Sequence, residues 1–429
     1  MKNPLSKLAY CSNPDMHPKS NFLLNRATPD GSMARVRFEL KNAKFPFYNP
    51  NILPYPAGSE YPYFGLVRTK SKSKSMYHHE LAYCDLKWAE TAVIGHTVLE
   101  CAEPGMQLDF GEEWTSPDGS CVKHSFLALA QGQTDPRLFF SALGEPLMIF
   151  GTNGHHNCLG QFIVDLRVLV PGFDKKMHLS KVPIRYPRLT EIPRVDLEEL
   201  EKNWFLMYDP LDSNKEYVHY DYLNRDFSPL INDSSLTTSR SSSRSIVDNL
   251  LVDYSESTKS ANDIHQATNS LLVTLCDFPC IPTIHNTVLI EIVHLKLMHS
   301  LTLYYRRYVV VMNATAPFEI LGRTENLMYA GTSLTEMVYT VSMVWDKDNF
   351  AGHEPWNEKI HGGQEIWFAL KTNRAATNSM SADSLMDSSN LYHGWLNDMV
   401  LINFGIKDSD SGCIHVRARE LLDCIRLAD

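Results

Sequence analysis

Long apolar runs are absent from this sequence of 429 residues. No stretch approaches the roughly 18 consecutive apolar residues that a membrane-spanning helix needs, so no such helix is expected. The first ten residues, MKNPLSKLAY, also lack the apolar core of a secretory signal peptide. We therefore expect either a cytosolic protein or a soluble piece of a protein that is anchored elsewhere.

An excess of positive charge is also missing. Lys and Arg total 40 against 50 Asp and Glu, which gives a formal net charge of -10. Nucleic-acid-binding proteins normally carry a basic face, so the composition argues against that class. The phosphate-binding loops GxxxxGK[ST] and GxGxxG and the metalloprotease motif HExxH are absent too. Individual side chains must therefore hold any phosphate, and no metal site is predicted.

Closely spaced cysteines are almost absent. Of the nine cysteines, only Cys276 and Cys280 are near neighbours in the sequence. Their C-x3-C spacing without a second Cys or His pair is a poor zinc signal. A chain of this length buries a large core without disulfide or metal staples. We expect most of the cysteines to be buried thiols.

Short strand-like runs are abundant, and Gly, Pro, Asn and Asp separate them. They include residues 63–68, 138–141, 146–151, 161–166, 204–208, 308–312 and 399–405. Turn-rich segments such as residues 141–145 indicate hairpins. Helical periodicity is confined to residues 196–203, 283–305 and 418–427. The regular hairpin rhythm favours an all-β propeller over a sandwich, with a few peripheral helices.

One segment breaks this rhythm. Residues 231–263 contain ten serines and too few apolar residues to order themselves, which predicts a flexible surface insertion. A second Ser-rich stretch, residues 375–390, is expected to be another loop. Strand signals on both sides of the insertion look alike, so the insertion need not mark a domain boundary. We therefore predict an N-terminal extension over residues 1–44 and a single β-propeller catalytic domain over residues 45–429.

Asp135, in the segment TDPR at residues 134–137, is the main candidate for acid–base chemistry. The proline after Asp135 is expected to hold it extended at a strand entrance. A nearby cation such as Arg137 lowers the pKa of a carboxyl group, and partial burial raises it. Asp135 can then act as a general base or acid toward a hydroxyl group. The alternative is a turn-forming Asp-Pro with a structural ion pair.

The segment EKNW at residues 201–204 is the second candidate. Lys202 suits phosphate as a point charge, Asn203 both donates and accepts, and Trp204 offers a face for a sugar ring. The alternative is a solvated strand start with a tryptophan in the core.

A third candidate region lies near the C-terminus. His393 can hydrogen-bond a sugar or neutralise phosphate, whereas Asp398 and Asp408 can bind vicinal hydroxyls; each is otherwise an ordinary turn residue. Scattered cations at strand ends are also expected to converge on an anionic ligand, for which a diphosphate is a natural candidate. These cations are Arg68, Arg137, Arg167, Arg185, Arg188 and Lys202.

Five segments in order carry a resemblance to a known family: YNPNILP at residues 48–54, the strand ending at Arg68, TDPR, EKNW and FGIKD at residues 404–408. Over residues 45–425 the chain resembles the fungal β-mannosyltransferases that build β-1,2-linked mannose caps. More distantly it is similar to the β-mannoside phosphorylases of glycoside hydrolase family 130 and to trypanosomatid mannosyltransferases. The resemblance implies a five-bladed β-propeller with its active site at one end of a central channel.

The resemblance also implies roles for individual residues. Asp135 matches the family's acid–base carboxylate, which in the phosphorylases acts through a sugar hydroxyl. Asn49, Arg68 and Asp408 match positions that hold the mannosyl unit. Thr134 stands where the phosphorylases usually carry Glu, which favours a transferase over a phosphorylase.

The implied reaction moves mannose from GDP-mannose to a mannoside or mannan acceptor, inverts the anomeric carbon and uses no metal or other cofactor. Lys202 and Asn203 match part of the anion-binding region, which arginines within residues 185–194 are expected to complete. The rival functions are a phosphorylase that uses mannose-1-phosphate and a non-catalytic propeller that binds glycan. The resemblance implies a Golgi or secretory-pathway membrane, with the anchor outside this chain; the alternative is the cytoplasm.

Overall fold

The computed structural model describes residues 5, 22–24, 33–40, 46–70, 79–91, 97–111, 121–129, 132–194, 197–210, 212–222, 226–230, 239–240, 264–299, 302–333, 336–346 and 391–428. The Ser-rich insertion predicted at residues 231–263 lies outside these ranges, apart from the two-residue strand β15 (Ser239–Arg240). The second Ser-rich stretch, residues 375–390, lies wholly outside them. Within the described ranges, no helix combines the length and apolar character needed to cross a membrane.

Almost all regular structure in the described ranges is β, as predicted, and much of it forms antiparallel runs of consecutive strands. The first run is β3 (Tyr48–Pro54), β4 (Tyr63–Lys70), β5 (His79–Glu90) and β6 (Thr97–Cys101), with β7 (Met106–Gln107) beside β5. The second is β8 (Thr134–Phe140), β9 (Pro146–Thr152), β10 (Gly160–Asp165) and β11 (Thr190–Glu191). The third is β12 (Phe205–Asp209), β13 (Asp212–Asp221), β14 (Asp226–Pro229) and β15.

Two further runs contain the C-terminal strands. The fourth is β17 (Leu271–Thr274), β18 (Thr287–His299), β19 (Thr302–Asn313) and β20 (Ile320–Arg323). Its additional partners are β16 (Ile264–Gln266), β23 (His393–Trp395) and β26 (Arg426–Leu427). The fifth is β22 (Val338–Trp345), β24 (Met399–Ile406), β25 (Asp410–Arg417) and β2 (Ala34–Arg37).

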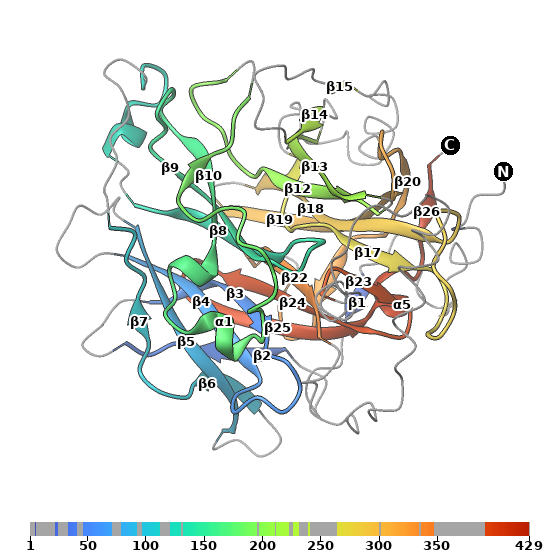
Figure 1. Ribbon diagram of the computed structural model, residues 1–429, viewed down its shortest axis with the longest axis horizontal. Helices are drawn as coiled ribbons and strands as arrows, with labels where there is room; N and C mark the ends of the chain where they lie inside the picture. Colours follow the sequence, from blue (N-terminus) through green and yellow to red (C-terminus); the bar gives the residue numbers. More distant parts are fainter. Residues whose placement is uncertain are drawn as a thin grey trace.

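Strand β2 joins two of these runs into one sheet of nine strands. It pairs antiparallel with β25 and parallel with β6, so four residues of the 1–44 segment belong to the sheet. A separate parallel pair is formed by β1 (Phe22–Leu24) and β21 (Leu327–Tyr329). In Figure 1, β3–β6 lie at the lower left, β8–β10 at the upper left, β12–β15 toward the top, and β22, β24 and β25 at and just below the centre.

Three buried apolar clusters hold neighbouring runs together. One lies between the first and second runs and includes Leu66 and Phe150. A second joins the second, third and fourth runs and includes Trp204 and Val310. The third packs the fourth run against the fifth and includes Ile402. Removal of these side chains from water is the main force that assembles such layers.

In the part of the chain that the structure describes, helices are few and short. They are η2 (Ser125–Leu129), η3 (Leu166–Val168), α1 (Phe173–Lys176) and α5 (Ala418–Leu421), of which α5 falls within the predicted segment 418–427. Residues 197–203 contain no helix. The helix expected over residues 283–305 is wrong, because β18 and β19 occupy that segment. Both faces of this hairpin contact apolar clusters, so its apolar residues do not alternate with polar ones.

The expectation of buried thiols is wrong for most cysteines in the described ranges. The disulfide bonds are Cys84–Cys101, Cys121–Cys158 and Cys276–Cys280, and Cys424 is also disulfide-bonded. The free thiol of Cys413 is buried. Two of the bonds join residues 17 and 37 positions apart, which strand pairing and loop packing bring together. Linear spacing alone gave no sign of these pairs.

Candidate functional site

A β-bulge near the start of β8 presents Asp135. The register between β8 and β9 shifts between Thr134 and Arg137, so Asp135 and Pro136 lie outside the regular pairing. The φ angle of Asp135 is 48°, which is left-handed and corrects the expectation of an extended residue. Proline disfavours the right-handed helical region for the residue before it, but aspartate tolerates the left-handed region better than most residues.

The same arrangement recurs in β3. Its register with β4 shifts between Tyr48 and Asn51, and Asn49, which precedes Pro50, has a φ angle of 57°. The fully buried amide of Asn51 ties the two bulged strands together. Its Nδ2 donates to the carbonyl of Pro136 over 3.1 Å, and its Oδ1 accepts from the backbone N–H of Leu138 over 2.9 Å.

Asp135 is paired with Arg68 of β4. Nη1 of Arg68 donates to Oδ1 of Asp135 over 2.7 Å, and the two side chains are 13% and 37% exposed. Burial raises the pKa of Asp135, but the charge of Arg68 lowers it, with smaller contributions from Arg137, Lys202 and His79. The net shift is below the ordinary value, so Asp135 is an ionised carboxylate at neutral pH.

The structure thus brings two more of the predicted cations to Asp135. Arg137 is almost fully buried, and its Nη2 donates to the hydroxyl of Tyr339 over 2.9 Å. Lys202 is exposed just before β12 and lies close enough to Asp135 to lower its pKa. Three cationic side chains from three different runs or their ends therefore act on the Asp135 carboxylate.

Asp408 lies on the same side of the molecule, in the turn between β24 and β25. It contributes with Asp135 to the raised pKa of Tyr48, for which burial is the main cause. The φ angle of Asp408 is 49°, and that of Asn203 is 58°. Four of the predicted residues therefore have left-handed backbone, a conformation that is often retained at functional sites despite its cost.

Trp204 does not offer a surface for a sugar. Its side chain is 1% exposed and packs edge-on against Tyr220, with ring centroids 4.6 Å apart. The guanidinium of Arg194 lies 6.0 Å from the Trp204 ring and pairs with Glu201 over 2.9 Å. These residues hold the entry to β12 and leave no open aromatic face.

His393 and Asp398 also make contacts within the fold. Nε2 of His393 and Oγ1 of Thr274 are 2.7 Å apart in the pairing of β23 with β17, where His393 is buried. The Asp398 carboxylate accepts from the backbone N–H of Trp395 over 2.9 Å and so closes a turn. Neither side chain is among the groups that shift the pKa of Asp135.

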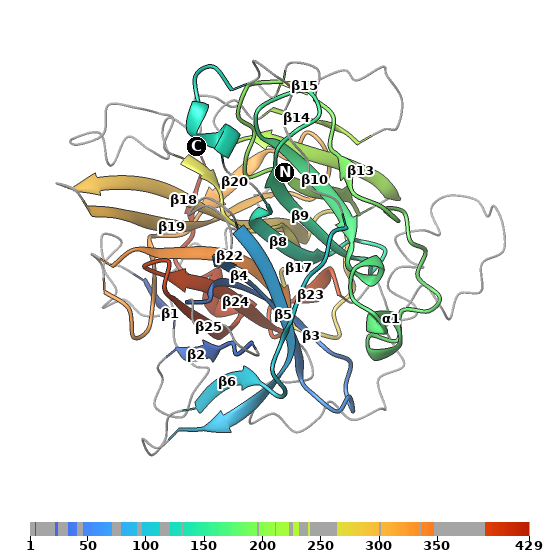
Figure 2. The same cartoon turned by 90° about the vertical axis from the view of Figure 1, so that its left-hand side faces the viewer.

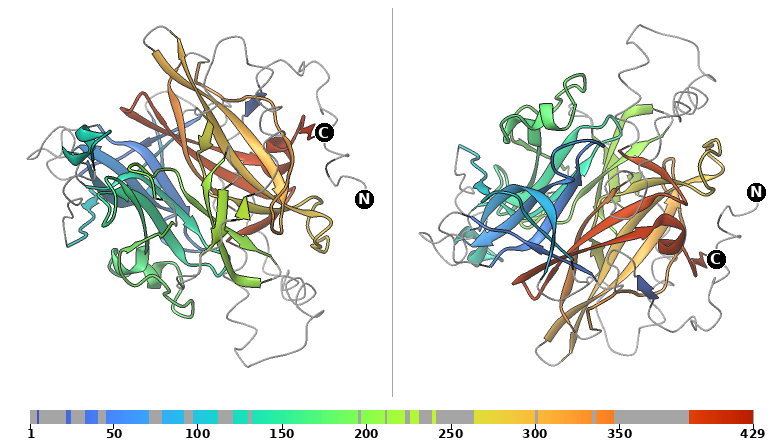
Figure 3. Two further views of the ribbon diagram at one scale, coloured as in Figure 1. Left: turned by 90° about the horizontal axis from the view of Figure 1, so that it is seen from above. Right: turned by 90° about the horizontal axis from the view of Figure 1, so that it is seen from below.

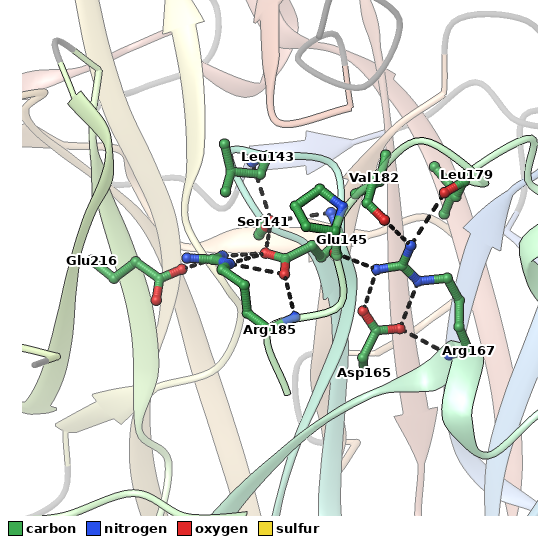
Figure 4. A network of polar contacts seen from close by, with 10 residues as sticks. Ser141, Leu143, Glu145, Asp165, Arg167, Leu179, Val182, Arg185 and Glu216 are labelled. Atoms are coloured by element: carbon green, nitrogen blue, oxygen red, sulfur yellow. Dashed lines mark hydrogen bonds and ion pairs between the residues drawn. The ribbon is translucent and has the colours of Figure 1, made fainter. Parts of the chain in front are cut away.

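Two predicted anion-binding arginines are engaged elsewhere, as Figure 4 shows. Arg167 forms a buried ion pair with Asp165, and its guanidinium also donates to backbone carbonyls. Arg185 binds Glu145 through Nε, 2.8 and 2.9 Å from the two carboxylate oxygens, and pairs with Glu216 over 2.6 Å. The contacts of Arg185 join the second and third runs, and those of Arg167 tie the end of β10 to the segment before β11, so both arginines serve packing.

Four residues near Asp135 were not found by sequence reasoning: His79, His265, Tyr305 and Tyr339. Burial and the nearby cations Arg137, Lys202 and Lys296 lower the pKa of His265 to about 3. Asp135 contributes to the raised pKa of both tyrosines, for which burial is the main cause. A single His or Tyr within a strand resembles an ordinary core residue, so the sequence carries no signal for them.

Among the described residues, no His, Cys, Asp and Glu side chains group in threes or more to hold a metal ion.

Comparisons with known proteins give likenesses in structure alone. No family model and no curated protein matches the chain. A candidate glycoside hydrolase from Parabacteroides distasonis ATCC 8503 aligns with TM-score 0.41 and 10% identity, over 97% of this chain and 99% of that one. A glycosyl hydrolase from Bacteroides ovatus gives 0.41 and 11%, over 96% and 95%. The α-L-arabinofuranosidase PaAbf62A from Podospora anserina, solved with cellotriose, gives 0.35 and 10%, over 90% and 98%. Likenesses this weak carry no argument about activity.

Proposed function

We propose that the chain is a carbohydrate-active enzyme, namely an inverting mannosyltransferase that forms β-1,2-linked mannose from GDP-mannose. The observation that carries the proposal is the ionised carboxylate of Asp135, which Arg68 holds at 2.7 Å in a group of three cations. A carboxylate kept ionised is suited to accept a proton, and clustered cations are suited to a leaving diphosphate.

The reaction is a single displacement. The acceptor hydroxyl attacks the anomeric carbon while the bond from that carbon to the diphosphate breaks on the opposite face. The hydroxyl proton passes to Asp135, directly or through a sugar hydroxyl, and GDP leaves with the bonding electron pair. Positioning of the two substrates and stabilisation of the leaving phosphate supply most of the rate enhancement.

The proposal assigns the remaining predicted residues near Asp135 to the donor. Asn49, Arg68 and Asp408 hold the mannosyl unit, and Lys202 and Asn203 bind the diphosphate, so no cofactor is required. Oδ1 of Asn49 is buried and has no hydrogen-bond partner among the described residues, which suits a group that waits for a ligand.

We take the five antiparallel runs to be the blades of a five-bladed propeller. Support comes from the strand order, since four runs each consist of four consecutive strands, and in the fifth β2 supplies the fourth strand beside β22, β24 and β25. Asn49, Asp135 and Tyr339 lie on the first strands of three runs, β3, β8 and β22, which would line the centre. The disulfide bonds favour the oxidising secretory pathway over the cytoplasm.

The test is incubation of the protein with GDP-mannose and short mannosides, followed by mass spectrometry of the products. The wild type should extend the acceptor, and Asp135→Asn should abolish transfer without changing the thermal unfolding midpoint. Asp109→Asn, at an exposed turn, is the matched control and should remain active. Near-wild-type turnover by Asp135→Asn would refute the assignment.

Two rivals have distinct outcomes in the same set of measurements. A phosphorylase would release mannose-1-phosphate from β-1,2-mannobiose and inorganic phosphate. A glycan-binding propeller would show no turnover with any donor and would tolerate Asp135→Asn.

A further inference from the structure

The β18–β19 hairpin has two chemically different faces near its outer end. The pairing places His294 opposite Arg307 and Lys296 opposite Tyr305, and side chains alternate between faces along each strand. Leu295, Leu297 and Tyr304 pack against the cluster that joins the second, third and fourth runs. His294, Lys296 and Tyr305 lie on the other face. Figures 2 and 3 show the hairpin, in yellow and orange, reaching past the neighbouring strands.

The second face contributes to a compact group of rings. The Tyr305 ring lies 5.1 Å from that of Tyr339 and 4.9 Å from that of His294, and His265 is nearly parallel to Tyr339 at 6.2 Å. His294 is fully buried, and its Nε2 accepts from the backbone N–H of Thr340 over 3.2 Å. His265, Tyr305 and Tyr339 are only half-buried. His294 therefore supports the group from within, while three rings remain accessible.

This group of rings lies next to the proposed base. Asp135 and Asp408 both contribute to the raised pKa of Tyr305, after burial and Tyr339. The hydroxyl of Tyr339 accepts from Arg137, the cation two residues after Asp135. His265 has a pKa of about 3, so it is neutral at physiological pH. The rings thus form an uncharged group, and two carboxylates lie close enough to Tyr305 to affect its pKa.

We infer that Tyr305, supported by Tyr339 and His265, is the surface on which the pyranose ring of the acceptor mannoside stacks. A pyranose offers an apolar face of C–H groups and a polar rim, which match an aromatic face beside carboxylates. The inference rests on the proposed function for the choice of acceptor over donor. Where Asp135 takes the proton directly, the acceptor hydroxyl lies against its carboxylate, and on this ground the ring beside Asp135 is assigned to the acceptor.

The test is calorimetric titration of β-1,2-mannobiose into the wild type and three variants, without donor. Tyr305→Ala should weaken binding about tenfold, a loss typical of one aromatic contact, whereas Tyr305→Phe should retain it. Tyr304→Ala is the matched control, because the Tyr304 side chain is next in sequence to Tyr305 but lies on the opposite face of the hairpin. Its affinity should equal that of the wild type.

Equal affinities of Tyr305→Ala and the wild type would overturn the inference, and so would an absence of mannobiose binding to the wild type. Weaker binding of GDP with unchanged mannobiose binding would also overturn it, because the surface would then serve the donor. Transfer from GDP-mannose separates the two proposals. If the wild type transfers mannose and Tyr305→Ala has the same acceptor KM, the inference is wrong and the proposed function stands. If the wild type shows no transfer but Tyr305→Ala selectively loses mannobiose binding, the proposed function is wrong and the inference stands.

Discussion

Arg68 and Asp135 come from different antiparallel runs and meet through one hydrogen bond of 2.7 Å between Nη1 and Oδ1. The guanidinium also lies 5.5 Å from the centre of the Tyr48 ring, so Arg68 is held on two sides. Because Arg68 uses Oδ1, Oδ2 of Asp135 is left to accept a proton. A single side chain therefore both positions the carboxylate and keeps it ionised.

Replacement of Arg68 should change the pH dependence of transfer. The charge of Arg68 lowers the pKa of Asp135, so Arg68→Met should raise that pKa. As the pH falls, Asp135 would then become protonated at a higher pH than it does in the wild type. We expect the acid limb of kcat/KM to move to higher pH, as measured from steady-state rates across the acidic range.

Arg35→Met is the matched control for this experiment. Arg35 forms an exposed ion pair with Asp410 over 3.0 Å, at the edge between β2 and β25. Its loss should leave the acid limb where it is in the wild type. An acid limb that stays in place in Arg68→Met would mean that Asp135 is not the titrating base.

Most strands could be predicted from the sequence, but the β18–β19 hairpin was expected to be a helix. Residues 63–68 and 399–405 are strands as expected, because turn residues bound short apolar runs. Residues 283–305 do not show the alternation typical of a strand because neither face of the hairpin is uniformly polar. Ile290 and Ile292 face one apolar cluster, while Leu289 and Val293 face another.

Part of the candidate site could be predicted from polar residues that interrupt strands. Asn49 and Asp135 each precede a proline at a bulge, and both have left-handed backbone that Asn and Asp tolerate. Trp204 was predicted from its place after Lys202 and Asn203, yet tertiary packing buries its ring. Tyr305 and His265 meet Tyr339 of β22 through tertiary packing between separate strands, which no local pattern reveals.

Asn51 should affect both stability and activity. Its amide makes two buried hydrogen bonds to the backbone on either side of Arg137, and alanine would leave both partners unsatisfied. We expect Asn51→Ala to lower the free energy of unfolding by about 3 kcal/mol. Because the bulge that presents Asp135 would loosen, kcat should also fall, which thermal unfolding and rate measurements would show.

Asn157→Ala distinguishes these two effects. Asn157 is also buried, and its Nδ2 donates to the carbonyls of Leu159 and Glu198. Its loss should lower stability by a similar amount and leave the kcat of the folded protein unchanged. Equal kcat values for the two variants would show that Asn51 supports the fold alone.

Gly405 should be intolerant of a side chain for a reason specific to the site. A Cβ atom at Gly405 would overlap Oδ1 of Asn49. Gly405→Ala should therefore displace Asn49 and weaken mannose and GDP-mannose binding about tenfold, since a buried polar contact would be lost. Titration calorimetry provides the measurement. Gly412→Ala is the control, because its Cβ would meet the Phe404 ring and affect stability without moving Asn49.

Lys202 tests the assignment of the diphosphate. Its exposed ammonium lies near both Asp135 and His265 and has the character of a point charge for phosphate. Lys202→Ala should weaken GDP binding about tenfold, as expected for loss of one charge-assisted contact, with little change in acceptor KM. The effect should shrink at high salt. Lys175→Ala, at an exposed position of α1, should leave GDP affinity unchanged. If Lys202→Ala binds GDP as tightly as the wild type does in calorimetry, the diphosphate must lie elsewhere.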